Sequence, residues 1–109
     1  MEPPLQPLRI PAGWIVRYHD LREIDPSPEA FAGSWLREDL LQLINGESGV
    51  LVDVGWYPEG NSDGEFSVVV YRGDFRGERT HEYHTPSRLA MVAEVERLLL
   101  FGSSPPDAS

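Results

Sequence analysis

The stretch Val50-Leu51-Val52-Asp53-Val54-Gly55-Trp56-Tyr57 carries the clearest strand signal in the chain. Every second position is occupied by Val50, Val52, Val54 and Trp56, which places these four on one face of an extended chain. Asp53 and Tyr57 fall on the other face. Pro58 ends the strand because proline has no backbone N–H for a sheet hydrogen bond. We expect the Trp56 side chain to belong to the core.

The segments on either side of this strand continue the pattern of a sheet. Residues 59–64 have the glycine and asparagine content of a turn, and alternation over 66–71 predicts the following strand. Before the central strand, residues 45–49 have the composition of a hairpin connection from a strand at 39–44. The leucines of that segment also fit a helix over 35–44, so both structures stay open there, and we favour the strand.

The remaining segments complete an α+β fold. Strands are expected at 14–19 and 80–85, a hairpin loop at 72–79 and a short helical turn at 29–33. Consecutive hairpins need no crossover helix. The fold class is therefore predicted to be α+β, with a mainly antiparallel sheet of four or five strands and a C-terminal helix packed on one face.

The C-terminal helix is predicted from its cap, its apolar residues and its end. Thr85 is the expected N-cap, Pro86 the first helical residue and Gly102 the residue that closes the helix. Glu94 and Arg97 are expected on the side away from the sheet. The apolar arc expected to pack on the sheet comprises Leu89, Met91, Val92, Val95, Leu98 and Leu99.

The domain organisation follows from length and composition. A chain of 109 residues fits one domain with a single core. Four prolines indicate an extended, proline-rich arm over residues 1–12, a single α+β domain then spans 13–102, and residues 103–109 are expected to form a disordered tail. No apolar run approaches the roughly 20 residues that span a bilayer, and residues 1–4 lack a signal region. We expect a cytoplasmic protein with no membrane partner.

The acidic residues are unevenly distributed. The chain has 18 acidic and 9 basic side chains and a formal charge of −9. Eleven of the 18 carboxylates lie between Asp20 and Glu65, where Arg22 and Arg37 are the only basic residues, so this region accounts for the whole net charge. Because such a charge repels phosphate, we expect no nucleic-acid partner.

The residue types that carry catalysis or hold metals lack the arrangement that either role needs. The absence of cysteine excludes disulfides, thiolate metal sites and thiol nucleophiles. His81 and His84 point to opposite faces of the predicted strand, so one metal ion does not reach both. Residues 59–64 resemble the start of a calcium loop, but the twelfth position is Val70 instead of glutamate. With no phosphate-binding loop and no nucleophile elbow, we expect no metal, no cofactor and no enzyme activity.

The candidate site is a protein-binding surface. Aromatic residues dominate many interfaces energetically, and surrounding acids steer a basic partner toward them. In the segment 53–65, two aromatic residues leave a strand and enter an acidic turn. Since Trp56 is expected in the core, the partner-binding residues are predicted to be the exposed tyrosine and the neighbouring acids, namely Glu38, Asp39, Asp53, Tyr57, Glu59, Asp63 and Glu65.

Five sheet-and-turn motifs follow one another over roughly residues 13–100. These motifs are Gly13-Trp14-Ile15-Val16-Arg17-Tyr18, Asp25-Pro26, Glu38-Asp39-Leu40-Leu41-Gln42-Leu43, Leu51-Val52-Asp53-Val54-Gly55-Trp56-Tyr57-Pro58 and Gly64-Glu65-Phe66. Their order resembles that of small bacterial immunity proteins of polymorphic and contact-dependent toxin systems. The resemblance implies a non-catalytic cytoplasmic antitoxin that binds and blocks a cognate toxin domain, frequently a nuclease. It implies no particular site residues, and the partner expected from charge is a basic toxin domain.

Two other functions remain open. A generic protein-interaction adaptor or subunit would use a sheet edge or the aromatic end of the central strand. A small hydrolase or isomerase would use His81, His84 or Asp53, and needs a shared pocket that brings these groups together. The acid excess is also explained by solubility alone. The sequence does not specify an oligomeric state.

Overall fold

The strands and helices follow each other in a simple order. The computed structural model describes residues 2–73 and 77–101. Within them, the elements are β1 (Trp14–His19), α1 (Pro28–Ala32), β2 (Leu41–Asn45), β3 (Val50–Tyr57), β4 (Glu65–Arg72), β5 (Glu78–Thr85) and α2 (Arg88–Phe101).

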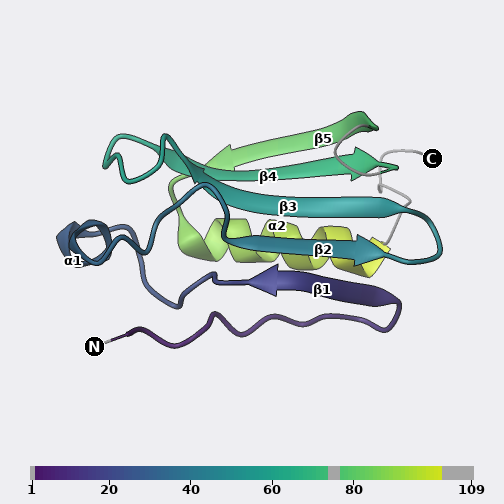
Figure 1. Ribbon diagram of the computed structural model, residues 1–109, viewed down its shortest axis with the longest axis horizontal. Coiled ribbons are helices and arrows are strands. Elements are labelled where there is room, and N and C mark those ends of the chain that lie inside the picture. The colour runs from purple at the N-terminus through teal and green to yellow at the C-terminus, as the bar shows by residue number, and fades with distance from the viewer. Residues whose placement is uncertain (1, 74–76, 102–109) are drawn as a thin grey trace.

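The five strands form one antiparallel sheet in the order β1-β2-β3-β4-β5, so each strand pairs with the next in the sequence. Helix α2 lies behind this sheet in Figure 1, and no described helix covers the face turned toward the viewer. The predicted α+β class, with a C-terminal helix on one face of an antiparallel sheet, is confirmed. The alternative helix over 35–44 is wrong, because β2 pairs with strands on both sides.

The core lies between the sheet and α2, and β3 shows how the sequence builds it. Trp56 is almost fully buried, as expected. Its ring makes edge contacts with Phe31 and Phe66, at centroid distances of 5.6 and 5.0 Å. The indole N–H donates to the carbonyl of Asn61 at 2.8 Å. One side chain therefore joins α1, the end of the sheet and the β3–β4 turn.

Helix α2 buries a narrower stripe than the sequence predicts. Met91, Val95, Leu98 and Leu99 are buried, whereas Leu89 is 68% exposed. The expectation that Leu89 packs on the sheet is wrong, because the buried side chains recur at positions 91, 95, 98 and 99, and residue 89 lies off that stripe.

The expectation that Glu94 points away from the sheet is also wrong. Glu94 lies beside β5, where its carboxylate accepts hydrogen bonds from His81 at 2.6 Å and from Arg97 at 2.6 and 2.9 Å. These bonds, first the one from Arg97, lower the pKa of Glu94. A charged side chain is expected to face solvent, but Glu94 is held at the edge of the core by His81 and Arg97.

The start of α2 is two residues later than the sequence predicts. Ser87, and not Thr85, is the N-cap: its Oγ accepts the backbone N–H of Ala90 at 3.1 Å. Thr85 is the last residue of β5, and its Oγ1 accepts the N–H of Ser87 at 3.1 Å. The proposed closing residue Gly102 and the proposed disordered tail lie outside the described residues.

Strand ends shift by one or two residues from their expected positions. β2 begins at Leu41 instead of Asp39, and β5 begins at Glu78 instead of Thr80. The segment 36–40, which precedes β2, lies alongside the end of β3. Arg37 and Leu36 accept hydrogen bonds through their carbonyls from the backbone of the 56–60 region, at 2.7 and 3.0 Å.

This close approach depends on Gly55. A Cβ atom at Gly55 would lie 2.0 Å from the carbonyl oxygen of Glu38, far inside contact distance. The atom it would meet is backbone, which cannot swing aside. Glycine at this position therefore lets segment 36–40 lie over β3 and places Glu38 at the end of the sheet.

We expect Gly55→Ala to lower the free energy of unfolding by about 2 kcal/mol, because the added methyl group forces segment 36–40 away from β3. Urea denaturation followed by tryptophan fluorescence measures the change. Gly46→Ala is the matched control, since its Cβ would meet only the tip of Ile15 at 3.9 Å, and we expect a change within about 0.5 kcal/mol. Equal stability of the two variants would contradict this account of Gly55.

Candidate functional site

The face of the sheet that lies away from α2 contains a shallow hollow of about 250 Å³. Strand register explains its composition, because Asp53, Val69 and Glu82 lie opposite one another on β3, β4 and β5. Ser67 and His84 form the next pair along the same face. The hollow is lined by Asp53, Tyr57, Ser67, Val69, Tyr71, Arg79, Glu82 and His84.

Asp53 is the most buried acid in this hollow, with 9% of its surface exposed. Its Oδ1 atom accepts hydrogen bonds from the amide of Gln42 and the hydroxyl of Tyr18, both at 3.4 Å. Burial raises the pKa of Asp53, and the nearby Asp39 raises it further, while the hydrogen bonds from Gln42 and Tyr18 act in the opposite direction. Burial of the charged form of this carboxylate therefore costs the fold stability.

Two tyrosines connect the predicted acids to one another. The Tyr18 hydroxyl donates to Oδ1 of Asp39 as well as to Asp53, at 3.4 Å in each case. The Tyr57 hydroxyl donates to the carbonyl of Glu38 at 3.3 Å. Burial raises the pKa of both phenols, with the charge of Asp53 as the second cause.

Five of the seven predicted residues therefore meet at one end of the sheet. Glu59 joins them because its Oε1 accepts the backbone N–H of Glu38 at 3.0 Å. Glu65 lies opposite Tyr57 in the sheet register. Asp63 lies in the β3–β4 turn, where the side chain of Asn61 accepts its backbone N–H at 2.8 Å, and its own carboxylate contacts none of the other six. The five that meet are Glu38, Asp39, Asp53, Tyr57 and Glu59.

Within the part of the chain that the structure describes, arginine does not neutralise the acids of this end. Across residues 2–73 and 77–101, none of the six predicted carboxylates forms an ion pair. The two arginines of the acidic region are both engaged elsewhere, because Arg22 and Arg37 pair with Asp20. We call Glu38, Asp39, Asp53, Glu59, Asp63 and Glu65 the acidic end of the molecule.

The β5 side of the hollow was not predicted from the sequence. There, Glu82 accepts hydrogen bonds from His84 at 3.1 Å and from Arg79 at 3.0 Å, and the His84 bond is the main cause of its lowered pKa. The Arg79 guanidinium lies 5.7 Å from the centre of the Tyr71 ring. No local motif marks these residues, although the alternation of residues 80–85 places Glu82 and His84 on one face.

The two histidines lie on opposite faces of the sheet, as alternation predicts. His84 lines the hollow, whereas His81 faces α2 and contacts Glu94. The hollow therefore brings together two of the three groups considered for a small enzyme, His84 and Asp53, but not His81. Among the residues that the structure describes, no three His, Asp or Glu side chains are grouped to hold a metal ion.

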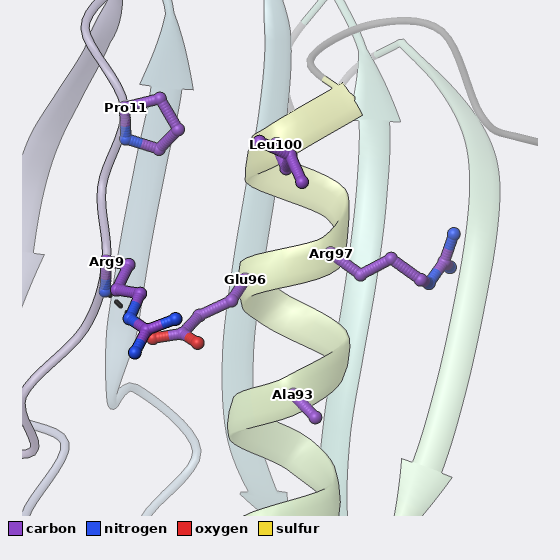
Figure 2. Close-up of a pocket in the computed structure, with 6 residues that line it drawn as sticks. All are labelled: Arg9, Pro11, Ala93, Glu96, Arg97 and Leu100. Atoms are coloured by element: carbon purple, nitrogen blue, oxygen red, sulfur yellow. Dashed lines mark hydrogen bonds between the residues drawn. The ribbon is translucent and has the colours of Figure 1, made fainter.

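A second hollow, of about 430 Å³, lies between the N-terminal arm and α2 (Figure 2). Its rim is closed by a hydrogen bond from the backbone N–H of Arg9 to Glu96 at 2.8 Å. Figure 2 shows Ala93 and Leu100 on the helix facing the same space as Pro11 on the arm. This hollow is largely apolar, and it contains none of the predicted site residues.

The comparisons with known proteins add no relative. The chain matches no protein-family model, no curated protein and no solved structure. Within the described residues, no helix is both long enough and apolar enough to cross a membrane.

We expect Asp53→Asn to raise the free energy of unfolding at pH 7, because asparagine keeps the Oδ1 acceptor and removes the buried charge. Because the pKa of Asp53 is raised in the folded chain, the folded state binds the proton more tightly than the unfolded state does. The loss in free energy of unfolding caused by the charge is therefore complete at pH values above the folded-state pKa. The cost vanishes as the pH falls below the pKa of the unfolded chain, about 3.9.

Urea denaturation at several pH values tests this expectation. The gain in stability from Asp53→Asn should shrink as the solution is acidified. Asp63→Asn, in the exposed turn, is the control and should give no such trend. A variant of Asp53 that is less stable than the wild type at pH 7 would contradict the expectation.

Proposed function

We propose that this chain is a non-catalytic binding protein that uses the acidic end and the adjoining open sheet face to bind a basic protein. The observation that carries the proposal is the set of six carboxylates at the end of β3 and in the adjoining hollow, none paired with a basic side chain in the described part of the chain. Like charges held together in this way destabilise the free protein unless a partner neutralises them.

The geometry of this end suits recognition of a protein surface. Tyr57 is 40% exposed and stands among the acids, and its hydroxyl is fixed by the carbonyl of Glu38. An ordered aromatic ring loses little conformational freedom on binding, which favours it as a contact of high energy. The surrounding charges would accelerate association with a basic partner and make it sensitive to salt.

The side chains of the hollow support binding over catalysis. Ser67 and His84 are cross-strand neighbours, yet Nε2 of His84 contacts Glu82 instead of the serine hydroxyl. A serine nucleophile needs a hydrogen bond to a base. The Oδ1 atom of Asp53 accepts hydrogen bonds from Gln42 and Tyr18, and neither of these residues is a catalytic base or nucleophile partner for it.

The more specific form of the proposal is an immunity protein. The resemblance of residues 13–100 to immunity proteins supports this class, and an acidic surface fits a toxin that grips a phosphate backbone through basic residues. The carboxylates of the acidic end would then occupy the groove that the toxin uses for its nucleic acid. A basic toxin domain, such as a nuclease, is the partner proposed.

Charge reversal at two exposed acids tests the proposal. Asp63→Arg/Glu65→Arg changes residues whose side chains make no hydrogen bond or ion pair with the described chain, so the fold should persist. We expect a basic protein captured by the tagged wild type from its native lysate at low salt to associate about tenfold more slowly with this variant. Association rates on a biosensor give the measurement.

Glu47→Arg/Glu78→Arg is the matched control, with the same change in charge placed at the opposite end of the sheet. It should leave most of the association rate intact. Equal slowing by both variants would indicate a non-specific effect of net charge and would contradict an interface at the acidic end. Capture of a partner that is acidic or insensitive to salt would favour the adaptor function, and loss of the partner's toxicity on co-expression would support the immunity function.

A further inference from the structure

The hollow on the open face contains two acceptor groups that the described chain leaves unused. Ser67 is 5% exposed and lines the hollow, but its hydroxyl makes no hydrogen bond to a described residue. Oδ2 of Asp53 is also unbonded there, because both described donors contact Oδ1. Both residues are at least nine-tenths buried, yet these two oxygen atoms are still reachable from the hollow, so a ligand that lies in it can supply donors to both.

The geometry around these two groups defines the shape of that ligand. Asp53 and Ser67 are diagonal neighbours on β3 and β4, a relation that places side chains about 7–8 Å apart at their base. The residue opposite Ser67 is Gly55, and the backbone of Glu38 and the ring of Tyr57 lie directly over it, so they bound the hollow on this side. Tyr57 and Tyr71 line the same hollow and present aromatic rings to its contents.

One guanidinium group of the chain, that of Arg79, already lies beside an aromatic ring and a carboxylate that line the hollow. The guanidinium of Arg79 lies 5.7 Å from the centre of the Tyr71 ring while it donates to Glu82 at 3.0 Å. Aromatic ring and carboxylate together are the usual surroundings of a guanidinium group. Tyr57 and Asp53 repeat this combination on the β3 side of the hollow, where no arginine of the described chain is present.

We propose that this hollow binds the guanidinium group of an arginine side chain, which the basic partner inserts between Tyr57 and Tyr71. This inference rests on the proposed function, because it assigns one residue type of the partner to one place on the open face. The planar guanidinium donates to Oδ2 of Asp53 with one nitrogen and to Oγ of Ser67 with another. An ammonium group, as a compact point charge, spans these two acceptors less well.

A small probe tests the site without the partner. The full chain is titrated with N-butylguanidinium, N-butylammonium and the uncharged N-butylurea while the Ser67 amide and Tyr57 ring signals are followed by NMR. We expect saturable binding of butylguanidinium with a Kd of about 1–10 mM, and binding of butylurea at least about tenfold weaker. Asp53→Asn should weaken butylguanidinium binding about tenfold, and Ser67→Ala should weaken it by a smaller factor.

Asp63→Asn removes the same charge outside the hollow and should leave the affinity unchanged. Absence of saturable binding, or equal affinity for the wild type and Asp53→Asn, would overturn the proposal. Butylammonium binding as tightly as butylguanidinium would overturn the assignment to arginine. If the probe fails to bind while partner capture still depends on Asp63 and Glu65, the arginine site is wrong and the proposed function stands. If the probe binds but partner capture does not depend on these two acids, the hollow binds guanidinium and the proposed interface at the acidic end is wrong.

Discussion

The indole of Trp56 is the contact on which the functional end of the molecule depends. Its ring packs against Phe31 of α1 and Phe66 of β4, and its N–H fixes the carbonyl of Asn61 in the β3–β4 turn. These contacts lie on the covered face of the sheet. They nevertheless set the position of the acids on the other face, because the turn and segment 36–40 are both anchored to the same stretch of β3.

One face of β3 stabilises the fold, and the other face carries residues of the proposed binding surface. On one face, valines and Trp56 fill the core against α2. On the other face, Asp53 is buried by its neighbours on the sheet instead of by a helix, and its charge is therefore costly to the free protein. A residue that reduces stability yet is held by ordered hydrogen bonds is typical of a binding surface.

The sequence predicts the local features of this protein and misses those that depend on strand pairing. The period of residues 50–57 gives β3, the burial of Trp56 and the opposite orientation of Asp53. The N-cap at Ser87 is missed because Thr85 is an equally suitable capping residue in the sequence. The exposure of Leu89 is missed because the buried stripe of α2 is narrower than the apolar arc of the sequence. The hollow brings Ser67, His84 and Asp53 together through the register of three strands, and no local pattern specifies that register.

The position of β5 at the edge of the sheet bears on the tendency of the protein to aggregate. β5 pairs only with β4, so within the described chain its other edge carries unpaired backbone groups of the kind that template aggregation. Charged side chains such as Glu78, Arg79 and Glu82 recur along this strand and discourage a second copy from adding to it. The residues that border the hollow thus also keep the sheet from growing, and the two roles constrain the same strand.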